Sequence, residues 1–254
     1  MGPGYFAPPA LRTRTSPSVT YTFDPALVDD LVAKRGSLHC FDKLDAARTA
    51  LLVVDMQNGF VDETNPTSLR GARDIVPTIN RLADAVRKSG GEVAWIVWAL
   101  TADHAHRWDV FFDDVLGKAA SERFRGAFTV GRESQKLWPG LDYREGERII
   151  GKTNFSGFSG SQGALEQHLR AHGRDTLLIA GTVTNVCCES TARDAAFANF
   201  RTIMVADANA GRSDVDNRVT FSTFIRAFGD VMTADEIIAR LARRSARDRG
   251  TAAS

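Results

Sequence analysis

The chain has 254 residues, of which 43% are hydrophobic and 25% are charged, a composition typical of a globular α/β protein. Its 32 basic and 31 acidic residues leave a net charge of +1, which argues against nucleic acid or an anionic membrane as the main partner. No apolar run reaches the roughly eighteen residues that a membrane span needs, and the first residues do not have the pattern of a secretory signal.

The first 20 residues are rich in Pro, Gly, Ser and Thr and show no periodicity, so we expect a flexible N-terminal arm at 1–20. A capped short helix is expected from Pro25, directly after Asp24. The sequence from 21 to 245 contains no internal repeat and no change in composition, which favours a single domain. A polar tail is expected at 246–254.

Apolar runs and helical patterns alternate along this domain. Helices are expected around 75–89 and 164–169, from Cys187 through Ala195, and from Thr233, where Thr233-Ala-Asp-Glu236 forms a capping box. Residues 101–145 are irregular and rich in aromatic and charged residues, which is typical of a loop over a site. Short apolar runs predict strands at 50–55, 93–98, 148–152, 176–181, 202–207 and 230–232.

This alternation predicts a doubly wound, Rossmann-like α/β fold, with a mostly parallel six-stranded sheet and helices on both faces. In such sheets the functional site lies beyond the carboxyl ends of the strands. Asp55, Lys152 and the turn from Gly181 to Cys187 all fall at predicted carboxyl ends. The sequence therefore predicts that a carboxylate, an ammonium and a thiol lie close together.

Each of these groups also has a purely structural interpretation. Cys187 is expected in the first turn of a helix, where the macrodipole and free N–H groups favour a thiolate and can hold an oxyanion. Buried structural cysteines are common, however. Asp55 is either a helix cap or a general base, and Lys152 by itself would be a solvated lysine. Cys188 is a rival nucleophile, because a helical step of about 100° prevents both cysteines from facing one site, and the pattern alone does not choose between them.

Further candidates lie after the second predicted strand. Asp103-His104-Ala105-His106 has the composition of a metal site, but no further ligand follows at a suitable spacing, so no metal is expected. No glycine-rich phosphate loop of standard spacing is present, and no cofactor is expected. Trp98, Trp108 and Phe111 are expected to line a pocket suited to a flat or apolar substrate body.

Three motifs resemble the isochorismatase-like cysteine hydrolase superfamily. They are Leu51-Leu-Val-Val-Asp-Met-Gln-Asn-Gly-Phe60, Lys152 with Phe155-Ser-Gly-Phe158, and Gly181-Thr-Val-Thr-Asn-Val-Cys-Cys-Glu-Ser-Thr-Ala-Arg-Asp194. The resemblance extends from about residue 48 to 243. Within the superfamily it is strongest to ureidoacrylate amidohydrolases, with N-carbamoylsarcosine amidases as more distant relatives.

The resemblance implies a catalytic triad of Asp55, Lys152 and Cys187. It selects Cys187 because the cysteine of the family follows a Thr-Asn/Asp-x step. It also implies a cis peptide between Thr182 and Val183, which aims the Val183 N–H, together with that of Cys187, at the substrate oxygen.

The implied activity is that of a cysteine-dependent amidohydrolase, which cleaves a C–N bond of a small amide or ureido compound through a thioester intermediate. Two alternatives are hydrolysis of another bond, such as the vinyl ether of isochorismate, and a non-catalytic binding protein on this fold. The cysteine disfavours the first, and the complete triad disfavours the second. The residues expected to bind substrate are Phe60, Trp98, Trp108 and Phe155.

The remaining expectations concern location and assembly. The three cysteines, Cys40, Cys187 and Cys188, do not form an even set for disulfide pairing, so a reducing cytoplasm is expected. A homo-oligomer, either a dimer or a tetramer, is also expected.

Overall fold

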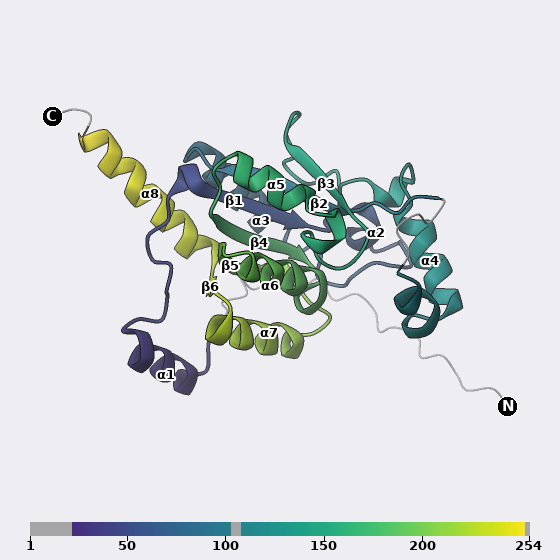
Figure 1. Cartoon of the computed structure of the whole chain (residues 1–254), viewed down its shortest axis with the longest axis horizontal. Helices are drawn as coiled ribbons and strands as arrows, with labels where there is room; N and C mark the ends of the chain where they lie inside the picture. The colour runs from purple at the N-terminus through teal and green to yellow at the C-terminus, as the bar shows by residue number, and fades with distance from the viewer. Residues whose placement is uncertain (1–21, 103–107, 252–254) are drawn as a thin grey trace.

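The computed structural model describes residues 22–102 and 108–251. Within these ranges, six strands form one sheet in the order β3-β2-β1-β4-β5-β6, and every neighbouring pair is parallel (Figure 1). The predicted doubly wound fold is confirmed, and the sheet is parallel throughout. The strands are β1 (Thr49–Val54), β2 (Glu92–Trp98), β3 (Arg148–Lys152), β4 (Thr176–Thr182), β5 (Arg201–Ala210) and β6 (Asp230–Met232).

The two central strands explain the unbroken apolar runs in the sequence. Every residue of β1 and of β4 is buried, because helices cover both faces of the sheet, and so both faces of each strand require apolar side chains. Alternate residues face opposite cores: Leu52 and Ile96 belong to one, and Leu51 and Trp95 to the other.

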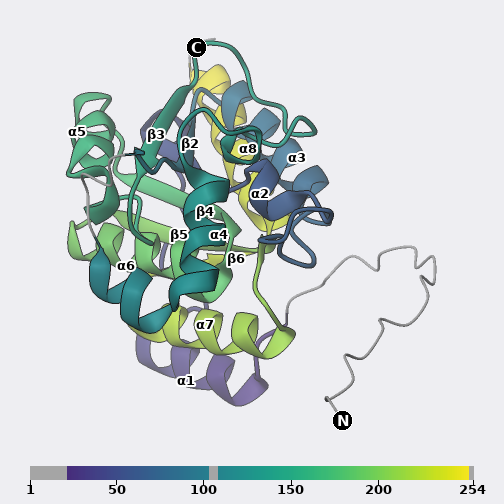
Figure 2. The same ribbon diagram turned by 90° about the vertical axis from the view of Figure 1, so that its right-hand side faces the viewer.

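The helices divide between the two faces of the sheet (Figure 2). The face of Leu51 and Trp95 is covered by α3 (Val76–Lys88) and α8 (Ala234–Thr251). The face of Leu52 and Ile96 is covered by α1 (Pro25–Arg35), α4 (Lys118–Phe128), α5 (Ala164–Ala171), α6 (Glu189–Phe197) and α7 (Asp214–Ala227). The short helix α2 (Asn58–Val61) follows β1.

Three helices, the short α2 together with α4 and α7, were not expected from the sequence. The prediction of an irregular loop at 101–145 was wrong for two segments, which form the helix α4 and the π-helical turn η2 (Val110–Val115). In α4, Phe128 is 0% exposed, and Phe124 lies one helical turn before it. Aromatic residues four positions apart lie on the same face of a helix. Similarly, α7 buries Phe221 and Phe224, which lie three residues apart.

The two ends of the chain were expected to be an N-terminal arm and a polar C-terminal tail. Helix α8 continues to Thr251, beyond the start of the polar tail expected at 246–254. The N-terminal arm expected at 1–20 lies outside the described residues. None of the helices in the described ranges combines the length and the apolar character that a membrane crossing requires.

The strand order reverses direction between β1 and β4. From β1 the chain moves outward to β2 and β3, and it then returns to form β4 on the other side of β1. Val54 pairs with Gly181 in the register of these two strands, and a Cβ at Gly181 would collide with the Val54 backbone oxygen. Ligands of doubly wound sheets bind at such a reversal, beyond the carboxyl ends of the strands.

Candidate active site

Three separate segments bring Asp55, Lys152 and Cys187 to this carboxyl edge. Asp55 directly follows β1 with a positive φ of 54°, and its N–H donates to the Ile96 carbonyl at 2.8 Å. Lys152 is the last residue of β3. Cys187 belongs to the π-helical turn η5 (Thr184–Cys188), which connects β4 to α6.

The lysine joins the carboxylate to the thiol. Its Nζ lies 2.9 Å from Asp55 Oδ2 and 3.5 Å from Cys187 Sγ. Asp55 and Lys152 are 0% exposed and Cys187 is 3% exposed, so little water competes with these contacts. The structure thus places the three predicted residues together. Both cysteines belong to the same buried cluster, and it is the Cys187 sulfur that lies beside the Lys152 ammonium.

Burial controls the proton on the thiol. The pKa of Cys187 is raised to about 12, first by burial and then by the Asp55 charge, while Lys152 acts in the opposite direction. Desolvation and the adjacent carboxylate therefore act against the thiolate that the helix start was expected to favour. The raised pKa favours the protonated form of the Cys187 thiol, next to the Asp55 carboxylate.

The same burial makes Asp55 a better base. Desolvation raises the pKa of Asp55, and Lys152 together with hydrogen bonds from Cys187 and Trp98 opposes this rise. A carboxylate with a raised pKa accepts a proton more readily, and the adjacent ammonium favours its ionised form. The arrangement can therefore move a proton from a thiol to a carboxylate.

The turn before Cys187 has the geometry that the resemblance implies. The peptide bond between Thr182 and Val183 is cis, and the Thr182 hydroxyl donates to the Asp55 carbonyl at 3.2 Å. The turn and the candidate base are therefore held together. That the Val183 and Cys187 N–H groups bind an oxyanion stays a prediction.

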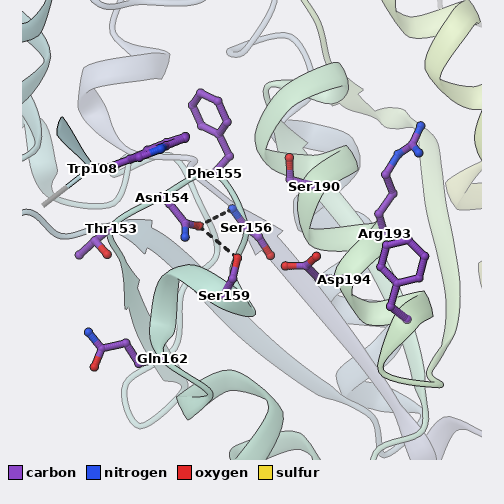
Figure 3. A pocket seen from close by; sticks show the side chains of 11 residues that line it. Trp108, Thr153, Asn154, Phe155, Ser156, Ser159, Gln162, Ser190, Arg193 and Asp194 are labelled. Carbon is purple, nitrogen blue, oxygen red and sulfur yellow. Dashed lines mark hydrogen bonds between the residues drawn. The ribbon is translucent and has the colours of Figure 1, made fainter. Parts of the chain in front are cut away.

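The aromatic residues predicted to bind substrate lie in two different environments. Trp108 and Phe155 pack edge to face at 4.8 Å and line a surface pocket of about 630 Å³ (Figure 3). Trp98 is 0% exposed beside Lys152, and Phe60 is 7% exposed and stacks on Phe128. Trp108 and Phe155 are therefore accessible to a ligand in this structure, and a substrate-binding role for any of the four stays a prediction.

The pocket is polar apart from these rings and that of Phe197, and Asn154 connects it to the buried residues. The Asn154 carbonyl accepts from Lys152 Nζ at 3.1 Å. Its side-chain Oδ1 accepts from the Ser156 N–H at 3.0 Å and from the Ser159 hydroxyl at 3.4 Å (Figure 3). Ser190, Arg193 and Asp194 line the other wall from α6. Sequence reasoning missed Asn154, whose only signal was its position two residues after Lys152.

Gln57 was also missed, although it belongs to the first motif. It is 0% exposed, and its side chain holds the backbone of Trp98 at both ends: Oε1 accepts the Trp98 N–H at 2.9 Å, and Nε2 donates to the Trp98 carbonyl at 3.0 Å. A buried amide with both functions satisfied fixes the end of β2 relative to β1.

The segment whose composition suggested a metal site is 103–106. His104 and His106 lie outside the described residues. Within 22–102 and 108–251, no group of three or more His, Cys, Asp or Glu side chains is arranged to hold a metal ion. The absence of a metal and of a cofactor from the reaction stays a prediction.

Comparison with known proteins gives a consistent set of relatives. Residues 49–236 match the model of the isochorismatase domain. A ureidoacrylate amidohydrolase from Variovorax paradoxus (strain S110) is 29% identical, over 77% of this chain and 82% of that protein. The crystal structure of a cysteine hydrolase from Pseudomonas syringae pv. phaseolicola 1448A has a TM-score of 0.72 at 28% identity, covering 79% of this chain and 95% of that one. N-carbamoylsarcosine amidase from Thermoplasma acidophilum has a TM-score of 0.60 at 26% identity, covering 74% and 97%.

Proposed function

The chain belongs to the isochorismatase family of hydrolases, and on that premise we propose that it is a cysteine-dependent amidohydrolase that cleaves a C–N bond of a small amide or ureido compound. The observation that carries the proposal is the position of Lys152 Nζ, 2.9 Å from Asp55 Oδ2 and 3.5 Å from Cys187 Sγ. These three groups supply a base, a cation and a nucleophile.

The first half of the proposed reaction forms a thioester. Asp55 takes the proton of the Cys187 thiol as the sulfur attacks the carbonyl carbon of the substrate. The Val183 and Cys187 N–H groups stabilise the resulting oxyanion. When the tetrahedral intermediate collapses, the C–N bond breaks, the Asp55 proton passes to the leaving nitrogen, and ammonia or an amine departs.

The second half restores the enzyme. Asp55, again a carboxylate, accepts a proton from water while the water oxygen attacks the thioester carbonyl. The C–S bond breaks, the proton passes to the sulfur, and the acid leaves. Lys152 favours the ionised form of Asp55 before each proton transfer and keeps the carboxyl group in position through both halves.

Both the relatives and the chemistry favour an amide or ureide as substrate. A ureidoacrylate amidohydrolase and an N-carbamoylsarcosine amidase are among the proteins to which the chain is similar. A carbonyl carbon carrying nitrogen is an electrophile for sulfur, whereas a vinyl ether requires an acid in place of a nucleophile. Trp108 and Phe155 suit a substrate with a flat or apolar body.

The test is an assay of hydrolysis with a panel of small amides and ureides that includes aryl amides and ureido acids. The kcat/KM of the best compound is then measured as a function of pH. We expect hydrolysis of at least one compound and a kcat/KM that falls on the acid side. The fall should be centred above the ordinary carboxyl value of 3.8, because burial raises the pKa of Asp55 and the base is lost as pH falls through that raised value.

A sample treated with a chelator serves as the control, and it should behave identically. A kcat/KM that stays constant down to pH 3 would remove Asp55 as the base. Activity that disappears with the chelator and returns with zinc would replace the thiol mechanism with a metal-dependent one.

A further inference from the structure

Trp98 occupies an unusual place for an aromatic residue near a candidate active site. It is the last residue of β2, it is 0% exposed, and Gln57 fixes its backbone N–H and carbonyl. Phe124 and Phe155 pack edge-on against its ring at 4.9 and 6.1 Å. The contacts with Gln57, Phe124 and Phe155 therefore hold the Trp98 indole in one position.

The face of this indole lies against the lysine. Lys152 Nζ lies 4.0 Å from the centre of the Trp98 ring, a cation–π contact made without competing water. A lysine side chain has four rotatable carbon–carbon bonds, and its ammonium would otherwise be free to move away from the carboxylate. The ring thus restricts Nζ to the space between Asp55 and Cys187.

The edge of the indole lies against the carboxylate and the thiol. The Trp98 Nε1 and both Asp55 oxygens are buried, and in the part of the chain that the structure describes none of these atoms has a well-aligned hydrogen-bond partner. Asp55 Oδ2 has the Lys152 ammonium at 2.9 Å as an ion-pair partner. Burial raises the pKa of Asp55 and of Cys187, and a hydrogen bond from Trp98 to each opposes the rise. A buried indole N–H requires an acceptor, and the reacting groups Asp55 and Cys187 are the polar neighbours on whose pKa it acts.

We infer that Trp98 is a positioning residue for the proposed reaction: its ring confines the Lys152 ammonium, and its N–H orients the Asp55 carboxylate and the Cys187 sulfur. The inference rests on the proposed amidohydrolase function. It replaces the expected role of Trp98 as a wall of the substrate pocket, because a side chain that is 0% exposed and packed on every described side has no free surface for a ligand.

The test uses Trp98→Phe, which keeps an aromatic ring near Lys152 and removes the N–H. Because a hydrogen bond to a charged group is lost, kcat should fall about tenfold to a hundredfold, with KM changed by less than about threefold. The acid limb of kcat/KM should move to higher pH, because Asp55 loses a donor that favours its ionised form.

A matched control lies on the same strand. Trp95 is also 0% exposed, but its Nε1 donates to Glu147 Oε2 at 2.8 Å on the opposite face of the sheet. Trp95→Phe therefore removes the same group from the same strand, and it should leave kcat and the acid limb unchanged. If Trp98→Phe and Trp95→Phe have the same pH profile as the wild type, the inference is wrong.

Two further measurements keep the test decisive. If Trp98→Phe does not fold, the tryptophans of the wild type and of Trp95→Phe are replaced biosynthetically by benzothienylalanine, which has the shape of tryptophan without an N–H. The acid limb should then shift equally in both proteins, and an unshifted limb would overturn the inference. Cys187→Ala is assayed in parallel: an active Cys187→Ala refutes the proposed function itself, whereas an inactive one with an unshifted Trp98→Phe refutes only the role of Trp98.

Discussion

Replacing Cys187 with alanine should lower turnover by on the order of ten-thousandfold or more, because no other group in the proposed mechanism can form the thioester. Cys188→Ala is the matched control, since the two cysteines are adjacent, both are buried, and both substitutions remove one sulfur. Cys188 is fully buried, so its loss should cost stability, and because the Lys152 ammonium lies beside the sulfur of Cys187, most of kcat should remain. The measurement is kcat and the melting temperature of both variants.

Two outcomes would contradict this assignment. An equal loss of kcat in both folded variants would mean that the position of Lys152 beside Cys187 Sγ does not identify the nucleophile. A loss confined to Cys188→Ala would transfer that role to the other cysteine.

The Asp55–Lys152 pair is expected to show the second largest effect. Asp55→Asn and Lys152→Met should each lower kcat at least about a hundredfold, the lower range for a positioned acid or base. Each single change also leaves one buried charge without its partner, which costs about 3–5 kcal/mol in the free energy of unfolding. The measurements are kcat and denaturant unfolding.

The double variant Asp55→Asn/Lys152→Met separates catalysis from stability. It removes both charges, so it should be more stable than either single variant and yet remain inactive. If the double variant regained activity along with stability, the pair would have only a structural role.

The strands were predictable because parallel strands buried on both faces leave unbroken apolar runs. The run from Ala50 to Val54 is such a case, and both of its neighbours in the sheet, β2 and β4, show the same pattern. Helix α4 was missed because charged residues interrupt it, while the contacts that stabilise it are aromatic and come from distant segments, such as Phe60 on Phe128 at 4.4 Å. Such contacts leave only a weak local pattern.

The meeting of Asp55, Lys152 and Cys187 was predictable for a topological reason, since each lies at the carboxyl end of a strand and those ends share one edge. The raised pKa of the thiol was not predictable from the sequence. It depends on how completely Cys187 is buried and on the nearness of Asp55, neither of which is encoded in the spacing of residues. The role inferred for Trp98 depends on the same burial.

The central claim is that Cys187 forms a covalent thioester, and acid-quenched intact-protein mass spectrometry tests it most directly. The wild type is mixed with an amide or ureide that it hydrolyses, quenched during turnover and digested to locate any adduct. We predict a mass gain in which the acyl group replaces the thiol hydrogen, on the peptide that contains Cys187 and at that residue, and no gain in Cys187→Ala. Hydrolysis by a Cys187→Ala variant at the wild-type rate, or an acyl group located on another residue, would contradict the account.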